Sequence, residues 1–355
     1  MTDTLRVVVT GATGNIGTGV VAALADDPTV ESIVGVARRT PRWSRPKLWT
    51  TGMNLVTATD AQLDALFDGA DVVIHLAWLF QPTRDPATTW RTNVLGTIRV
   101  VESVLRRGVP ALVYSSSVGA YSPGPKDHAV AEDWPTHGWP GAAYTREKSY
   151  LERVLDVVER DHPETRIVRI RPGFVFQRGS AQQQRRLFAG PFLPVSLVRP
   201  GAVPVVPDIP GLRTQAVHST DLGEAFRRAA VTPVRGAFNV AADRVVDPGL
   251  LAELLGARLV PVPARLARNA VSTAYRLRLV PASPQLFDAV LRIPIMDTTR
   301  ARTELGWSAR YSAGEALGEF LTGLRQGAGL PTPPLRPSMP GGRLGEAATG
   351  VGARP

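Results

Sequence analysis

Short apolar runs alternate with helical patterns through the first half of this 355-residue chain. The apolar runs are LRVVVTG, SIVGVAR, DVVIHLA, ALVYSSS and RIVRIRP. Runs of this kind are typical of strands that are buried on both faces. Between most of them lie amphipathic stretches such as IGTGVVAALADD and NVLGTIRVVESVLRRG. Strand, helix and strand at this spacing predict an α/β fold whose parallel sheet is doubly wound, with helices on both of its faces.

The composition changes after the fifth apolar run. Prolines are frequent over residues 191–213, and a strand and a helix are then expected around 214–241, returning to the first sheet. We therefore predict a sheet domain over residues 1–175. Residues 176–327 are predicted to form mainly a second, smaller lobe. Residues 328–355 are rich in proline and glycine and hold few large apolar side chains. Because such a segment buries too little to offset its ordering entropy, we predict that it is disordered.

Composition also excludes several classes of site. The chain has no cysteine, so it has no disulfide, thiolate nucleophile or cysteine metal ligand, and the spacing of its histidines predicts no metal site. No signal peptide and no membrane-spanning run are found, which predicts a cytoplasmic protein. The net charge of +10 comes mainly from scattered arginines, with clusters at 38–47 and 265–278. We expect only the first cluster to be functional, and we expect neither a nucleic acid nor a membrane as partner.

Three glycines stand between the first predicted strand and the first predicted helix, in the stretch VTGATGNIGTGVVAAL. Gly11, Gly14 and Gly17 lie three residues apart. In a dinucleotide site the first glycine permits the tight turn, the second admits the pyrophosphate and the third lets helix and strand pack closely. The start of the helix then offers free N–H groups to phosphate. The glycines alone leave an ordinary strand-to-helix loop open as the alternative.

The stretch TGATGNIG resembles the start of the extended short-chain dehydrogenase/reductase family, of the NAD-dependent epimerase/dehydratase type. Further motifs follow in the order of that family: DVVIHLA at 71–77, TNVLGT at 92–97, LVYSSSVGAY at 112–121, YTREK at 144–148, RPGFVF at 171–176, VHSTDLGEAF at 217–226 and DTTRARTELGW at 297–307. The resemblance covers about residues 5–325. It implies a Rossmann domain that binds NAD(P) over 1–175 and a C-terminal lobe that shapes the substrate site.

The resemblance also implies a catalytic set of Ser117, Tyr144 and Lys148. Tyr144 and Lys148 are one helical turn apart, so they share a helix face. A free tyrosine has a pKa of about 10. We expect the nearby ammonium group to lower the pKa of Tyr144, so that it serves as general acid or base. Ser117 is expected to hold the substrate oxygen for proton transfer.

The second strand ends in Ala37, Arg38 and Arg39, where proteins that bind NAD usually carry an acidic residue. Arginine suits the 2′-phosphate of NADP, so the sequence favours NADP over NAD. Asp60 is a candidate for contact with the adenine. The full set of implied cofactor contacts is Gly11, Thr13, Gly14, Asn15, Ile16, Gly17, Arg38, Arg39, Asp60, Leu76, Ala77, Asn93, Ser115, Tyr144, Lys148 and Pro172.

These residues predict an enzyme that transfers a hydride between the nicotinamide and a carbinol or carbonyl carbon of a small molecule. Oxidation, reduction and epimerisation through a transient ketone use the same residues and stay open. One alternative is a regulatory protein that senses the dinucleotide without turnover. Another is a nucleotide-sugar epimerase or dehydratase. The predicted partner is a small-molecule substrate. The sequence leaves open whether the chain forms a homodimer.

The residues of the second lobe bear on the substrate. Family members that act on nucleotide-linked sugars commonly carry an arginine at the position of Thr214, whereas here Arg213 stands one place earlier. On a strand that offset points the side chain to the opposite face. The stretch over 188–211 is apolar and rich in proline, which suits a small apolar substrate. The aromatic residues Trp78, Phe80, Trp134 and Trp139 are candidates for either the cleft or the core, and we expect structural roles for His75 and His218.

Overall fold

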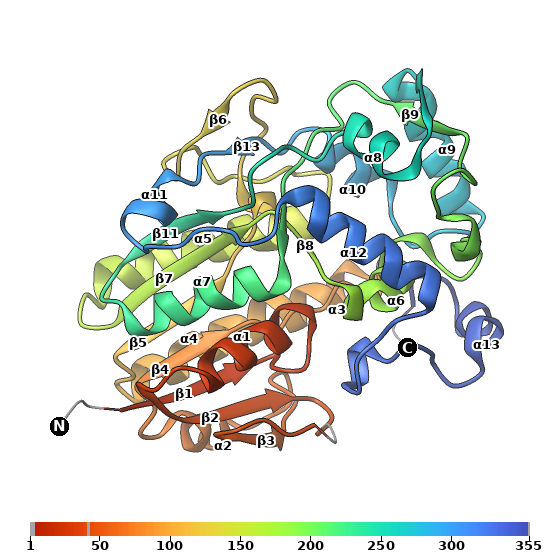
Figure 1. The fold of residues 1–355 in the computed structure, drawn as a ribbon. Coiled ribbons are helices and arrows are strands. Elements are labelled where there is room, and N and C mark those ends of the chain that lie inside the picture. Colours follow the sequence, from red (N-terminus) through yellow and green to blue (C-terminus); the bar gives the residue numbers. More distant parts are fainter. Residues whose placement is uncertain (1–3, 41–42, 354–355) are drawn as a thin grey trace.

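The computed structural model describes residues 4–40 and 43–353. Its main feature is a sheet of seven parallel strands in the order β11-β7-β5-β4-β1-β2-β3 (Figure 1). The strands are β1 Leu5–Thr10, β2 Val30–Ala37, β3 Leu48–Gly52, β4 Val72–His75, β5 Ala111–Ser115, β7 Arg166–Pro172 and β11 Gly236–Val240. The strand order reverses between β1 and β4, which is where α/β sheets of this kind bind ligands. The predicted doubly wound α/β fold is confirmed.

Helices cover both faces of the sheet. Those at its faces are α1 Asn15–Ala25, α2 Asp60–Phe67, α4 Gly96–Arg106, α5 Ala143–Asp161 and α7 Ser219–Val231. The two cores follow the alternation of side chains along β1: Val7 and Val9 pack with α1 and α7, and Val8 packs with α4 and α5. Both faces of the strand are therefore apolar, as the sequence predicts.

The second lobe is built from short elements above the carboxyl edge of the sheet. Its strand pairs are β8 Phe174–Phe176 with β10 Ala216–His218, β9 Val205–Asp208 with β12 Arg258–Pro261, and β6 Ala129–Val130 with β13 Ile295–Met296. Its helices are α6 Ala181–Gln184, α8 Pro248–Leu255, α9 Ala264–Arg276, α10 Pro284–Val290 and α12 Ala313–Gln326. Helix α11 Thr299–Thr303 packs instead on β11 of the main sheet, where Ala301 joins the core of Val7 and Val9. A separate apolar core, with Val206, Leu255 and Leu321 among its members, holds part of this lobe together.

Shorter helical turns connect these parts. They are α3 Pro86–Trp90, η1 Arg91–Leu95, η2 Val118–Ala120, η3 Arg178–Ser180, η4 Arg185–Ala189, η5 Val195–Leu197, η6 Pro333–Leu335 and α13 Gly342–Ala348. The strand and helix expected around 214–241 are β10, α7 and β11, and β11 pairs with β7 at the edge of the main sheet. In the part of the chain that the structure describes, no helix has the length and apolar character needed to cross a membrane.

The C-terminal segment differs from the sequence expectation. Residues 328–353 are packed on the body of the protein, with Thr332 and Leu335 fully buried. The hydroxyl of Thr332 donates a hydrogen bond to the carbonyl of Thr13 at 2.8 Å. A buried ion pair also joins Arg185 to Glu346 at 2.8 Å. The composition of the segment reports only its own residues. The contacts that stabilise it come from partners more than 150 positions away in the sequence, so composition alone predicts disorder.

Candidate active site

The carboxyl ends of four strands meet at one edge of the sheet. Thr10 of β1 lies beside His75 of β4, His75 lies beside Tyr114 of β5, and Ser115 lies beside Ile170 of β7. Residues that directly follow these strands are therefore neighbours, although they are far apart in sequence. This edge gathers the glycine turn, Leu76 and Ala77, the serine run and the segment after Pro172.

The glycine turn is closely packed at two of its glycines and open at the third. Gly11 has φ +74°, and a Cβ there would lie 2.7 Å from the backbone nitrogen of Ala77. A Cβ on Gly17 would lie 2.3 Å from the carbonyl oxygen of Gly11. At Gly14 an added Cβ would meet the Gly11 oxygen at 3.4 Å and no second atom within 4 Å among the described residues. Gly11 and Gly17 therefore serve packing, whereas Gly14 faces open space.

That open space lies at the start of α1. Gly14 is the N-terminal cap of α1, and no side chain in the described ranges caps the helix there. The first N–H groups of α1 are thus available to an anion. Asn15 and Ile16 are partly exposed at the same place, whereas Thr13 is buried. This arrangement fits the pyrophosphate of a dinucleotide.

The two arginines expected at the ribose stand at the carboxyl edge of the sheet. Arg38 and Arg39 are exposed and follow the end of β2. The end of β2 touches the glycine turn, because the backbone N–H of Gly11 donates to Val36 at 2.8 Å. Two positive charges therefore stand on the sheet edge next to the open glycine.

Asp60 lies elsewhere than the sequence predicts. It starts α2, after the Thr59 cap, and its carboxylate pairs with Arg99 at 2.8 Å. The residues that directly follow β3 are Met53 and Asn54, and Met53 donates its N–H to Ala37 at 2.9 Å. Met53 and Asn54, rather than Asp60, therefore stand at the carboxyl end of β3. The capping pattern at Thr59 is the signal that would have placed Asp60 in a helix.

The loop after β4 is fixed by Asn93. Its side chain is fully buried, accepts from the N–H of Leu79 at 2.7 Å and donates to the carbonyl of Leu79 at 2.9 Å. The same side chain donates to Glu147 at 2.7 Å. In this structure Asn93 therefore positions the loop after β4, and its implied contact with the dinucleotide stays a prediction.

His75 and His218 have structural roles, as expected. His75 is bonded on both ring nitrogens, to Thr10 at 2.6 Å and to Thr97 at 2.8 Å. Burial lowers its pKa to about 3, so the ring is neutral at physiological pH. His218 caps α7, and its Nδ1 lies 2.7 Å from the hydroxyl of Thr220.

The segment after β7 is tied to the start of α1. The side chain of Asn15 donates to the carbonyl of Val175 at 3.0 Å. Gln177 returns the contact by donating to the backbone carbonyl of Asn15 at 2.9 Å. Pro172 itself is buried at the end of β7. These bonds hold the two sides of the site in a fixed relation.

Ser117 and Tyr144 are neighbours in the structure. Ser117 caps the short helix η2, where its hydroxyl accepts from the N–H of Gly119 at 2.9 Å. Both side chains lie close to Gly119, since a Cβ built there would be 3.4 Å from the Ser117 hydroxyl oxygen. Gly119 lets the two approach, because a Cβ there would lie 2.8 Å from the Tyr144 ring. The glycine two residues after the serine is a signal that the sequence analysis did not use.

Lys148 takes a different position from the expected one. It is buried, and its ammonium group donates to the carbonyl of Ser115 at 2.7 Å and to the hydroxyl of Tyr114 at 3.3 Å. Burial lowers the pKa of Lys148 well below its usual value. Burial likewise raises the pKa of Tyr144, to about 12, although the nearby Ser117 hydroxyl opposes this rise. The expected lowering of the tyrosine pKa by Lys148 is not found in this structure, because Lys148 is not among the groups that shift the pKa of Tyr144.

Aromatic rings enclose Tyr144. The Phe80 ring stacks on it at 5.2 Å between centroids, and the Trp78 ring meets it edge-on at 5.7 Å. Phe188 packs against Phe80 at 5.8 Å. Together with Leu187 and other mainly apolar residues, these rings line a cleft at the Tyr144 side chain. The sequence left the roles of Trp78 and Phe80 open between cleft and core, and it gave no sign of Phe188.

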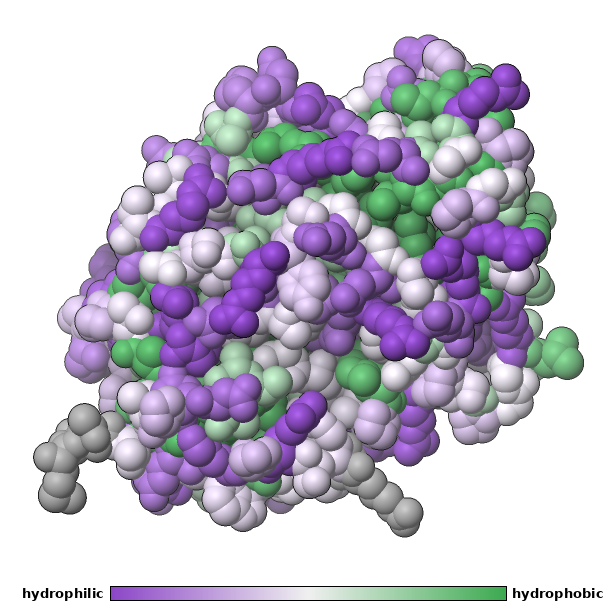
Figure 2. All heavy atoms as spheres, viewed as in Figure 1, coloured by the Kyte–Doolittle hydropathy of each residue, from purple (hydrophilic) through white to green (hydrophobic). Residues whose placement is uncertain are grey.

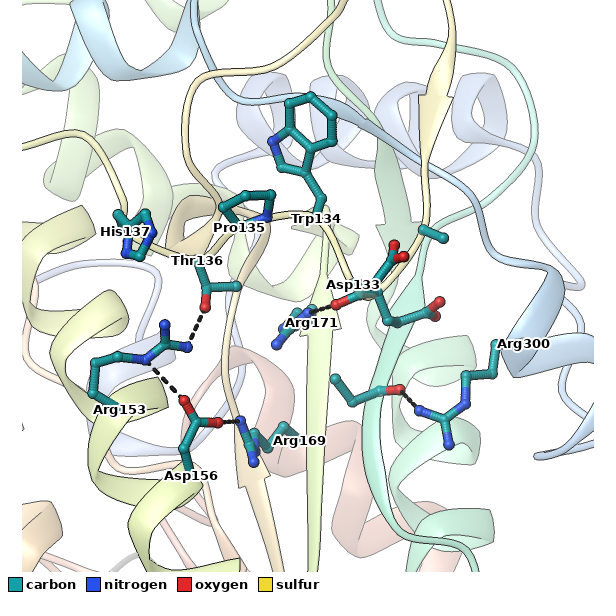
Figure 3. A pocket seen from close by; sticks show the side chains of 13 residues that line it. Asp133, Trp134, Pro135, Thr136, His137, Arg153, Asp156, Arg169, Arg171 and Arg300 are labelled. Atoms are coloured by element: carbon teal, nitrogen blue, oxygen red, sulfur yellow. Dashed lines mark hydrogen bonds and ion pairs between the residues drawn. The ribbon is translucent and has the colours of Figure 1, made fainter.

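The other two tryptophans lie away from this cleft. Trp139 is covered by the guanidinium of Arg292, at 4.2 Å from the ring centroid. Trp134 lines a second cavity, which Figure 3 shows between α5, β7 and the 131–137 loop.

The second cavity is rich in charge, but its charges neutralise one another. Arg169 pairs with Asp156 at 2.6 Å, and Arg153 pairs with the same carboxylate at 2.9 Å (Figure 3). Arg171 binds the buried Glu152 at 2.9 Å. Burial opposes the ionised form of Glu152, but its bonds with Arg171 lower its pKa to about 2. We therefore regard this cavity as the surface of a buried ion-pair network that joins α5 to β7.

The strand order, the glycine turn and the position of the site define a Rossmann fold of the dinucleotide-binding class. The model of the NAD dependent epimerase/dehydratase family matches residues 7–241, and the chain belongs to that family.

The chain is similar to proteins from several sources. An uncharacterized protein of Mycobacterium tuberculosis is 27% identical over 331 residues, which cover 92% of this chain and 31% of that protein. This chain thus spans about a third of the length of that relative. MoeE5, solved in complex with UDP-glucuronic acid and NAD, has a TM-score of 0.64 and 23% identity over 90% of this chain and 99% of its own. A monomeric L-threonine 3-dehydrogenase from a metagenome has a TM-score of 0.66 and 15% identity over 90% of this chain and 99% of its own.

Proposed function

We propose that this chain is an NAD(P)-dependent oxidoreductase that acts on a carbonyl or alcohol group of a small, mainly apolar molecule. The observation that carries the proposal is that Ser117 and Tyr144 both lie against Gly119, with Tyr144 in the wall of an aromatic cleft. The pair stands at the carboxyl edge of the sheet, where the glycine turn also lies. Proton transfer at an oxygen atom is the chemistry that two such hydroxyl groups can perform.

In its protonated state Tyr144 can act as a proton donor. With a pKa of about 12, the phenol keeps its proton at neutral pH and is ready to give it to a carbonyl oxygen. Ser117 holds the same oxygen through its hydroxyl, so the acceptor is oriented before the proton moves. In the reverse direction the phenolate takes the proton of an alcohol.

The dinucleotide would be held by the open turn at Gly14, by the start of α1 and by Arg38 and Arg39. When bound, it supplies or accepts a hydride through its nicotinamide ring. The exposed arginines at the end of β2 favour NADP over NAD, since a guanidinium binds phosphate oxygens through charge-assisted hydrogen bonds.

The shape and chemistry of the cleft favour a substrate without a nucleotide. Its walls include Phe80, Leu187 and Leu286, and its charged member, Glu147, is already bonded to Asn93 and Thr89. A diphosphate group needs cationic partners.

The position that commonly holds the diphosphate-binding arginine in nucleotide-sugar enzymes is Thr214. It is buried against Val246 and exchanges backbone hydrogen bonds with it. Its neighbour Arg213 accepts a hydrogen bond from Lys126 through its carbonyl.

A substrate panel tests the proposal. Oxidation of NADPH and NADH is followed optically with apolar ketones and aldehydes, with UDP-glucose as a separate arm. Turnover of an apolar carbonyl compound that is lost in Tyr144→Phe supports the proposal. Turnover or tight binding of UDP-sugars alone would assign the chain to the nucleotide-sugar enzymes, as in the MoeE5 complex. Dinucleotide binding with no turnover of any carbonyl compound would favour the sensor alternative.

A further inference from the structure

A long stretch of the second lobe carries positive charge without negative charge. Between Glu253 and Asp288 the sequence has no acidic residue. The arginines of this stretch are Arg258, Arg265, Arg268, Arg276 and Arg278. The proposed enzyme activity makes no use of them, and the sequence analysis treated the cluster at 265–278 as a matter of composition. Most of these arginines belong to helix α9 or directly follow it.

Helix α9 lies on the surface of the molecule and has no buried residue. Leu266, Ala270, Thr273 and Leu277 are spaced by four, three and four residues, so they form one stripe along the helix. All four are exposed, and the exposed fractions of Leu266 and Leu277 are 61% and 65%. The stripe of α9 is thus an uncharged face turned to the outside.

Arginines flank this stripe. Arg265 and Arg276 are exposed and lie one position before Leu266 and Leu277. Arg268, by contrast, is neutralised by Asp288 at 2.9 Å. The helix therefore presents leucines bordered by cationic side chains, which is the pattern of an interfacial amphipathic helix.

Segments that adjoin α9 in the chain also carry exposed apolar side chains. In β12, which runs into α9, Leu259 and Val260 are 45% and 42% exposed. Leu279, just after the helix, is 42% exposed. Figure 2 shows hydrophobic residues gathered in the upper right of the molecule, over the region labelled β9, α8 and α9 in Figure 1. Asp208, at the end of β9, is an exposed acidic residue at the border of this region.

We propose that this surface, the α9 face, docks on an anionic lipid bilayer. We define the α9 face by Leu259, Leu266, Leu277, Arg265 and Arg276. Exposed leucines gain free energy from burial at the acyl boundary, and exposed arginines gain it from anionic headgroups. An acidic protein would complement the arginines alone, whereas a bilayer complements both groups and also suits the net charge of +10. This proposal departs from the expectation, made from the sequence, of no membrane partner.

The α9 face also adjoins the candidate active site. The hydroxyl of Tyr275 in α9 donates to the carbonyl of Thr83, and Thr83 lines the aromatic cleft. Ser283 and Leu286, which follow α9 in the chain, line the cleft as well. A bilayer on this face would bring dissolved apolar molecules close to the cleft. The docking proposal does not depend on this, because it makes no use of catalysis.

Sedimentation with lipid vesicles tests the proposal without measuring activity. The full chain is mixed with vesicles of phosphatidylcholine alone or with added phosphatidylglycerol. One double variant is Arg265→Glu with Arg276→Glu, and an independent one is Leu266→Ser with Leu277→Ser. Because the exposed side chains support no core, both variants should melt as the parent chain does.

Matched controls place the same changes on the sheet domain. Arg107→Glu with Arg160→Glu alters the net charge equally, and Leu95→Ser with Val157→Ser removes similarly exposed apolar groups. We expect binding to the anionic vesicles alone, weakened at least about tenfold by either α9 variant and unchanged in the controls. Absence of vesicle binding in the parent chain, or an equal loss in the controls, would overturn the proposal. So would binding to polyglutamate without binding to vesicles, which would assign the face to an acidic protein.

Discussion

Lys148 lies over the face of Trp78, with its ammonium nitrogen 3.5 Å from the ring centroid. The indole N–H of Trp78 is buried and has no hydrogen-bond partner among the described residues. The Trp78 ring therefore contacts Lys148 through its π face, which stabilises the charged form of the lysine. A desolvated contact of this kind contributes roughly 2 kcal/mol.

Replacing Trp78 should change the pH dependence of activity. Burial already lowers the pKa of Lys148, and the Trp78 face favours the charged form. Trp78→Leu should lower the pKa of Lys148 further, so that the ammonium group loses its proton at a lower pH. Activity that depends on the charged group should therefore begin to fall at a lower pH than in the parent chain. The measurement is kcat/KM against pH, with Trp78→Phe as a control that keeps a ring face. An unchanged alkaline limb in Trp78→Leu would contradict the role.

Replacing Tyr144 should abolish turnover and leave binding intact. Tyr144→Phe removes one hydroxyl group while the ring keeps its stacking with Phe80. We expect kcat to fall about 10²–10⁴-fold, which is the usual contribution of a general acid or base, with unchanged dinucleotide affinity by fluorescence titration. Tyr150→Phe, on the exposed side of the same helix, is the control. Activity above about a tenth of the parent value would exclude Tyr144 as the proton donor.

Replacing Arg38 should alter the choice of cofactor. Arg38→Asp removes a partner of the 2′-phosphate and adds a group that can bind a ribose hydroxyl. NADP affinity should fall at least about tenfold while NAD affinity holds or rises. Titration of both cofactors measures this, with Arg146→Asp as a control of equal charge on the surface of α5. The assignment of NADP is wrong if the parent chain binds NAD more tightly than NADP.

The C-terminal segment should contribute to stability. Leu335 is fully buried, so Leu335→Ala should lower the free energy of unfolding by about 2–5 kcal/mol. Leu344 is 85% exposed, and Leu344→Ala should change it by less than about 0.5 kcal/mol. Chemical denaturation of the two variants makes the comparison. Equal stability of both would show that the segment does not dock in solution.

The parts of the molecule that sequence predicted are those encoded by local patterns. The alternation of apolar runs gave the sheet, and the glycines at 11, 14 and 17 gave the turn, because each pattern reports the packing of its own residues. The spacing of Tyr144 and Lys148 placed both at the start of one helix. It did not show that Lys148 turns to Trp78, which depends on a loop 70 positions away.

The parts that sequence missed depend on distant partners or on exact boundaries. Asp60 was taken for a residue next to β3, but the Thr59 cap starts α2 there and directs the carboxylate to Arg99. The family resemblance implies Asn93 as a cofactor contact, whereas its bonds in the structure go to Leu79 and Glu147. Its burial against Leu79 is set by the path of another segment.

The hydrogen bond between Thr332 and Thr13 ties the C-terminal segment to the glycine turn, so docking of the segment can affect the affinity for a dinucleotide bound at that turn. A dinucleotide at the glycine turn and the segment around Thr332 would contact the same short piece of backbone. If they influence one another, thermodynamic linkage makes the effect reciprocal and equal in size. Amide hydrogen exchange around Leu335 would then respond to added dinucleotide, and cleavage of the segment by a protease would shift dinucleotide affinity by the same factor. Hydrogen exchange in the segment around Leu335 would thus show whether a dinucleotide occupies the glycine turn.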